Sequence, residues 1–224
     1  MNRRDLLTCN LAAKSKPAGP WGAEFYTNAV LRTQDNKPVR FHDDLIQGKI
    51  SLINFFYASC HTWCPRSAAK LSKVQKMLGD RVGRDIFMYS ISLKPWEDDP
   101  ATLKRYAQSF GAKPGWFFLT GDDYDITTLR FKLLRLDQPM LDFDPIQHTG
   151  MVRIINAPLT KWTMCPLGAT VQQIVDAVSW VEPTPPMEVR LRQNAAKQAK
   201  IDEQMRVLQP QWAEFRQAHG WSVS

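Results

Sequence analysis

The stretch SLINFFYASCHTWCP, residues 51–65, carries the features that decide the fold. It lies within a nearly continuous apolar run from Ile50 to Ala58, which is typical of a strand buried on both faces of a sheet. Pro65 suits the first turn of a helix, where its missing backbone N–H costs nothing. Two thiols, Cys60 and Cys64, lie between this strand and this helix. A helix N-terminus favours thiolates, which bind soft metals and exchange disulfides, so this junction is the candidate site.

Strand and helix patterns alternate along the chain after this junction. Apolar residues at helical spacing stop at Gly79, and Asp99 followed by Pro100 predicts the start of another helix. The other expected elements are strands over 86–93 and 116–120, a helix through 126–134, a hairpin of 151–155 with 161–164, and a helix over 171–178 with Thr170 as its cap. This alternation predicts a mostly parallel sheet with helices on both faces and antiparallel strands added by the hairpin.

Three regions are expected from the two ends inward. Residues 1–22 are polar and predict a flexible lead-in, and NRRDLL at 2–7 resembles the start of a twin-arginine export signal. The apolar stretch that should follow is interrupted, so the choices are a degenerate signal or an ordinary disordered terminus. Residues 23–182 form the expected domain, which begins with a hairpin-like pair over 29–33 and 39–41. Residues 183–224 hold a proline-rich linker and an accessory helix.

The accessory helix is expected over Met187 to Gln209, a charged segment of helix-forming composition. Leu191, Ile201, Met205 and Leu208 are too sparse for a strong coiled coil. We therefore expect a helix that packs on the domain or on a partner.

Composition narrows the class of protein. The 224 residues suit one α/β domain with extensions. The net charge of +7 is spread along the chain without a block of like charges, which argues against nucleic-acid binding and is compatible with a periplasmic or membrane-facing protein. A run of about 18 apolar residues is absent, so the sequence predicts no membrane-spanning segment.

The dithiol favours metal or redox chemistry. Strand, dithiol and helix in this order form the thioredoxin arrangement, but the spacing here is C-x-x-x-C. One more residue can spread two thiolates around a metal: two cysteines suit Cu(I), and a nearby imidazole completes a site for Cu(II) or Zn(II). His148 lies in a loop before a strand and is free to reach the strand ends, whereas His61 is expected to point outward. Cys165 is either a third thiol near the site or a small buried residue, and burial is favoured.

The chain resembles the Sco/SenC family, thioredoxin-fold copper proteins linked to assembly of the copper centre of cytochrome c oxidase. The resemblance covers roughly residues 26–181 and rests on matching residues in order along the domain. These residues are Phe55 to Cys60, Cys64-Pro65, Ser90 to Leu93, Asp98 to Pro100, Tyr106-Ala107, Phe110-Gly111, Pro114 to Gly121 and His148-Thr149.

The resemblance implies a thioredoxin-like α/β fold, a central mixed sheet flanked by helices, with Cys60, Cys64 and His148 as copper ligands. The two cysteines would form a disulfide when oxidised. It implies a metallochaperone that delivers Cu(I) or Cu(II) to a cytochrome c oxidase subunit, has a thioredoxin-like reductant as a second partner, and works in the periplasm or on the outer side of the membrane.

Some residues depart from the family pattern or have a simpler explanation. Lys94 stands where many members carry an aspartate, which affects an acidic docking surface or the choice of partner. His61 and Trp63 are unusual within the motif. Acidic residues near the site often follow the second strand in this family, and Asp98 and Asp99 are the candidates, although a helix cap explains them more securely.

Two enzyme-like alternatives use the same thiols. A thiol–disulfide oxidoreductase would need Cys60 and Cys64 but not His148. A peroxiredoxin-like thiol peroxidase would need an activating arginine, for which Arg66 and Arg153 are the candidates.

Overall fold

The computed structural model describes residues 25–134, 150–184 and 187–219. The chain divides into two compact units, residues 1–182 and 183–224. The first unit contains one seven-stranded sheet with the strand order β2-β1-β5-β4-β3-β6-β7. Its strands are β1 (Val30–Thr33), β2 (Pro38–Arg40), β3 (Ile50–Phe56), β4 (Ile86–Ser92), β5 (Trp116–Gly121), β6 (Met151–Asn156) and β7 (Lys161–Pro166).

The sheet is mixed, as the sequence predicts. Strands β3, β4 and β5 are parallel at the centre, while β1 and β6 join this core antiparallel on either side. β2 and β7 complete the two antiparallel hairpins at the edges. The α/β class, the N-terminal hairpin and the added antiparallel strands are therefore confirmed.

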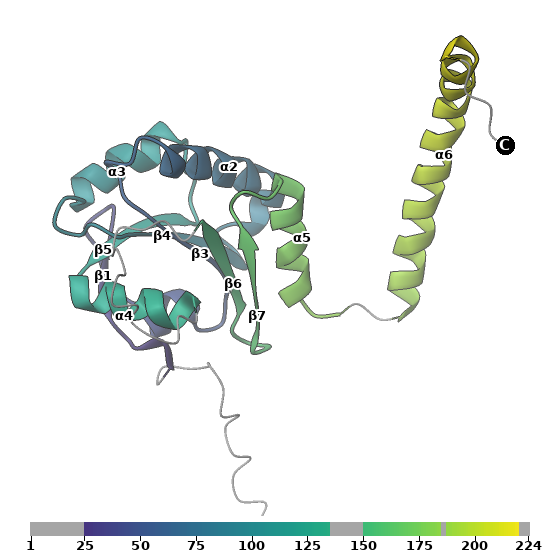
Figure 1. Ribbon diagram of the computed structural model, residues 1–224. Helices are drawn as coiled ribbons and strands as arrows, with labels where there is room; N and C mark the ends of the chain where they lie inside the picture. The colour runs from purple at the N-terminus through teal and green to yellow at the C-terminus, as the bar shows by residue number, and fades with distance from the viewer. Residues whose placement is uncertain (1–24, 135–149, 185–186, 220–224) are drawn as a thin grey trace, which may run out of the picture. The chain divides into compact units, whose positions relative to one another are not determined.

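Helices cover both faces of the sheet (Figure 1). On one face, α2 (Trp63–Leu78), α3 (Pro100–Ser109) and α5 (Val171–Val181) bury apolar side chains against residues such as Leu52 and Ile154. On the other face, α4 (Asp123–Leu134) and the short π-helix η1 (Phe41–Ile46) pack against residues such as Ile53 and Ile155. Adjacent residues of β3 and β6 thus enter opposite cores, which explains their nearly continuous apolar sequences.

Two short connections place the candidate site. The chain leaves β3 at Phe56 and enters α2 at Trp63, while it leaves β4 at Ser92 and enters α3 at Pro100. Because β3 and β4 are neighbouring parallel strands, both connections emerge at the same edge of the sheet. The dithiol lies on the first connection and Asp98 on the second.

A close backbone approach fixes a turn on the other side of this unit. Gly115, just before β5, has a φ of 91°, and a Cβ placed there would lie 2.3 Å from the backbone nitrogen of Gly83. Only glycine combines this conformation with this contact. The short 3-10 helix η2 (Gly79–Arg81) leads into the same turn.

In the second unit, residues 187–219 are described as one long helix. α6 (Met187–His219) continues through Pro210 and extends ten residues beyond the expected end at Gln209.

Candidate metal centre

The two thiols of the motif face each other across the start of α2. Cys60 lies in the connection after β3, and Cys64 is the second residue of the helix. The backbone N–H of Cys64 donates a hydrogen bond to the Cys60 sulfur at 3.3 Å, and the Thr62 hydroxyl oxygen lies 3.9 Å from that sulfur. Both cysteines are buried, with 4% and 3% of their surfaces exposed. The predicted position of the dithiol at a strand–helix junction is confirmed.

The surroundings make the two thiols unequal acids. Burial opposes ionisation of Cys60, but hydrogen bonds from the backbone and side chains of Cys64 and Thr62 outweigh it and lower the Cys60 pKa to about 7. Burial raises the pKa of Cys64 to about 12 despite a backbone hydrogen bond involving Tyr57. At neutral pH Cys60 is therefore the more acidic thiol and carries the larger thiolate fraction, whereas Cys64 stays protonated.

A buried carboxyl group joins the two connections. Oδ2 of Asp98 accepts hydrogen bonds from the backbone N–H of Ala58 at 3.0 Å and from the Ser92 hydroxyl at 2.5 Å. Burial raises the pKa of Asp98. Asp99 behaves differently, because its side chain accepts from the Thr102 N–H at 2.7 Å and caps α3. The cap interpretation is thus correct for Asp99 and wrong for Asp98, which holds the loop of the dithiol.

Lys94 takes part in a surface network beside Cys60. Its ammonium lies 3.2 Å from the Glu97 carboxylate and 4.9 Å from the centre of the Tyr57 ring. Glu97 in turn accepts a hydrogen bond from the Ser59 hydroxyl at 2.9 Å. These bonds, that from Ser59 first, lower the Glu97 pKa. The lysine that departs from the family pattern therefore contacts the loop immediately before the first thiol.

A pocket of about 600 Å³ opens beside Cys64. Arg66 is exposed, whereas the Lys70 ammonium donates to the carbonyl groups of Leu167 and Ala169, both at 2.6 Å. The pocket is lined by Phe55, Phe56, Trp63, Cys64, Arg66, Ser67, Lys70, Gly150, Leu167 and Gly168. Trp63 is 61% exposed, so an aromatic ring stands beside the thiols at the surface.

The histidine expected to complete the site, His148, lies outside the described residues. Among the residues that are described, no group of three or more His, Cys, Asp or Glu side chains is arranged to hold a metal ion. His61 is exposed, in agreement with the expectation that it points outward.

Cys165 and Arg153 bear on the alternatives. Cys165 is 7% exposed in β7 opposite Val152, and burial raises its pKa, so the expectation of a buried residue is confirmed. Arg153 follows Val152 on β6 and therefore points to the face opposite the one that buries the dithiol. Its guanidinium carbon lies 3.5 Å from the centre of the Trp162 ring. Of the two arginines considered for a peroxidase, only Arg66 is on the dithiol side.

Sequence reasoning missed one residue of this site, Thr62, and favoured the wrong role for another, Asp98. Thr62 lowers the pKa of Cys60, and its place between the cysteines just before the helix was the available signal. The role of Asp98 depends on Ala58, forty positions away in the sequence, and no local pattern shows such a contact.

No described helix is both long and apolar enough to cross a membrane.

Comparison with known proteins gives one consistent family. The SCO1/SenC family model matches residues 25–181. An SCO2-like protein of Rickettsia conorii is 31% identical over 122 residues, which are 52% of this chain and 58% of the relative. An SCO1 homologue of Bacillus subtilis is 32% identical over 93 residues, 41% of this chain and 47% of the relative. The match thus spans little more than half the length of the first curated relative, and less than half of the second.

Solved structures share the fold. A SCO1/SenC family lipoprotein of Bacillus anthracis superposes with a TM-score of 0.57 at 25% identity, covering 68% of this chain and 91% of that one. Copper-bound ScoI of Bradyrhizobium japonicum gives a TM-score of 0.54 at 25% identity, covering 69% and 97%. The predicted thioredoxin-like fold is therefore confirmed. Because the family match extends over most of the chain, from the N-terminal hairpin to α5, this protein belongs to the SCO1/SenC family.

Proposed function

We propose that this protein binds copper through Cys60, Cys64 and His148 and delivers it to the copper centre of a respiratory oxidase. The observation that carries the proposal is the pair of facing thiols, of which Cys60 has a pKa of about 7. A family relative with copper bound, ScoI of Bradyrhizobium japonicum, supports the choice of metal.

The donor set suits copper. Thiolates are soft ligands that select Cu(I) over the harder cations common in cells. Cys60 supplies the first thiolate at neutral pH, and Cys64 must give up a proton to become the second. Because a metal cation stabilises a coordinated thiolate, the raised pKa of Cys64 makes capture pH-dependent rather than preventing it.

Chain connectivity supports His148 as the third ligand. Gly150 lines the same pocket as Cys64. His148 precedes Gly150 by two positions in the sequence. An imidazole adds the harder nitrogen donor that Cu(II) requires.

Delivery would proceed by exchange of thiolate ligands with an acceptor. Acceptor thiolates replace Cys64 and Cys60 in turn, and each departing thiolate recovers a proton according to its pKa. The dithiol that remains can lose two electrons and two protons to an oxidised partner and form a disulfide, which a thioredoxin-like reductant would reverse. The site of action that fits is extracytoplasmic and membrane-associated, as the Bacillus anthracis lipoprotein relative suggests.

A second candidate, a thiol–disulfide oxidoreductase, is favoured by the low pKa of Cys60. An attacking thiol reacts best when its pKa lies near the ambient pH. In this role Cys60 attacks the disulfide of a target protein, Cys64 resolves the mixed disulfide, and His148 is dispensable.

Anaerobic copper titration of the reduced protein tests the proposal. We expect tight binding of one copper per chain, lost in Cys60→Ser and in Cys64→Ser and retained in Cys165→Ser as the matched control. His148→Ala should keep Cu(I) and lose the thiolate-to-Cu(II) absorption. Unchanged copper binding by either cysteine variant would refute the site, and a wild type that reduces disulfides without binding copper would establish the second candidate.

A further inference from the structure

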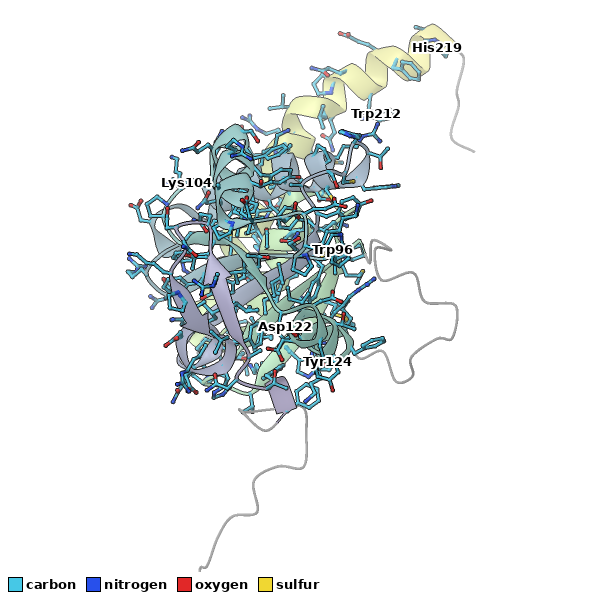
Figure 2. All side chains as sticks on the ribbon, turned by 90° about the vertical axis from the view of Figure 1, so that its left-hand side faces the viewer. Trp96, Lys104, Asp122, Tyr124, Trp212 and His219 are labelled. Atoms are coloured by element: carbon cyan, nitrogen blue, oxygen red, sulfur yellow. The ribbon has the colours of Figure 1, made fainter. Side chains whose placement is uncertain are left out.

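An exposed apolar stripe runs along α6. Two members lie four residues apart near the start of the helix, the other five recur at alternating spacings of four and three residues, and each is between 41% and 69% exposed. They are Met187, Leu191, Ile201, Met205, Leu208, Trp212 and Phe215. Figure 2 labels Trp212 on this helix, together with His219, whose ring stacks on Phe215 at 4.2 Å.

The spacing is that of a coiled coil. Four successive seven-residue repeats separate Met187 from Phe215, and the two intermediate stripe positions without an apolar residue are Asn194 and Gln198. A repeat of seven residues keeps one narrow seam facing a partner helix as two helices supercoil. A helix that lies on a lipid surface shows a wider apolar face with a period of 3.6 residues. The helical extension to His219 adds Trp212 and Phe215, so the stripe is longer than the expected segment up to Gln209 indicates.

We propose that α6 pairs with α6 of a second copy of this chain in a parallel, two-stranded coiled coil. The charged residues beside the stripe favour a second copy of this chain in a parallel orientation. Lys197 and Asp202 are exposed on the two sides of the seam. In a parallel, in-register pair these two positions face each other across the interface, so each Lys197 meets Asp202 of the second copy, twice per dimer. Antiparallel pairing would not bring these opposite charges together.

The polar seam residues fit the same arrangement. Asn194 would face Asn194 of the second copy, where the two amide side chains can hydrogen-bond to each other, and a polar pair in the seam costs stability. Gln198 donates to the Asp202 carboxylate at 2.8 Å within one helix, which holds that carboxylate beside the seam.

Pro210 lies at the outward position of the repeat, opposite the stripe. Proline inside a helix removes a backbone hydrogen bond and destabilises an isolated helix. Pairing of Leu208, Trp212 and Phe215 with a second helix would offset that loss, and the proline ring would remain in solvent.

Sedimentation equilibrium of the full chain under reducing conditions tests the pairing. The expected species is a dimer of about 51 kDa, twice the chain mass of 25.7 kDa. Leu208→Asp should weaken dimerisation at least tenfold, whereas Val207→Asp, at the neighbouring position outside the stripe, should not. Val207 is a matched control because it is 55% exposed against 41% for Leu208. A monomeric wild type at about 100 µM, or equal effects of the two substitutions, overturns the proposal.

A charge swap tests the orientation. Lys197→Glu should weaken the dimer, and Lys197→Glu combined with Asp202→Lys should restore it; failure of the restoration excludes the parallel register. Binding of a monomeric protein to anionic lipid vesicles, lost in Leu208→Asp, would instead assign the stripe to a membrane surface and overturn pairing. Copper binding of Leu208→Asp should equal that of the wild type, so this inference and the proposed function fail or stand separately.

Discussion

Cys60 should ionise two pH units below an ordinary thiol, and the consequence can be measured directly. With a pKa of about 7 instead of 9.0, about half of Cys60 is thiolate at pH 7 instead of about 1%. The rate of alkylation by iodoacetamide follows the thiolate fraction. At pH 7 the reaction should therefore reach about half of its high-pH limit, a gain of about 50-fold in reactive fraction.

The assay uses variants that isolate each thiol. Cys64→Ser, combined with Cys165→Ser and Cys9→Ser, should show a rate that rises with a midpoint near pH 7. The matching variant that retains only Cys64 should react without a plateau below about pH 10, because burial raises its pKa to about 12. Comparing the shapes of the two pH profiles rather than the absolute rates removes the difference in access to the two buried sulfurs.

One further variant tests how much the Thr62 hydroxyl contributes to the lowered pKa of Cys60. Thr62→Val removes a hydroxyl that helps to lower the Cys60 pKa, so it should move the midpoint upward without changing the fold. A Cys60 midpoint near 9 in the single-thiol variant, or profiles that coincide for the two cysteines, would refute the asymmetry of the site.

Three other outcomes are expected. Because the pKa of Asp98 is raised in the folded state, protonation of Asp98 stabilises the fold fully below the unfolded-state pKa of 3.8, and this stability is lost as pH rises through the raised pKa. Denaturant unfolding of Asp98→Asn should lack this pH dependence, and equal pH profiles for the variant and the wild type would contradict the prediction. Gly115→Ala should lower the free energy of unfolding by about 2–3 kcal/mol, because its Cβ would collide with Gly83, while Gly168→Ala in open space should not. Loading Cu(I) at pH 7 should release about 1.5 protons per copper, falling to about one at pH 9, as Cys60 ionises before the metal arrives; pH-stat titration measures this, and constant release would contradict it.

Local chemistry made much of the fold predictable. Asp99 and Thr170 were expected to cap helices, and both side chains accept hydrogen bonds from backbone N–H groups three residues later. Such caps depend only on neighbouring residues, so sequence spacing is enough to locate them. The central strands were equally clear, because a continuous apolar run is typical of a strand covered on both faces.

Features that depend on distant contacts were not predictable. The π-helix η1 (Phe41–Ile46) has no periodic signal of its own; it buries Phe41, Leu45 and Ile46 against the sheet. In the sequence Asp98 looks like part of a helix cap, because its hydrogen bond from the Ala58 backbone N–H forms only in the folded chain. α6 continues through Pro210 to His219, ten residues beyond the expected end at Gln209, although proline inside a helix removes a backbone hydrogen bond.

The candidate site also has some features that the sequence predicts and others that it does not. The place of the dithiol follows from the order of strand and helix, and resemblance supplied the ligand set. The inequality of Cys60 and Cys64 does not follow from either, because it depends on how deeply each sulfur is buried and which N–H groups reach it.

The most direct test of the central claim is copper K-edge X-ray absorption of the anaerobically loaded protein. We expect two sulfur donors and one imidazole nitrogen around copper in the wild type, with the nitrogen lost and both sulfurs kept in His148→Ala. A copper environment of nitrogen and oxygen donors alone, or one unchanged by His148→Ala, would contradict a copper site built on these residues.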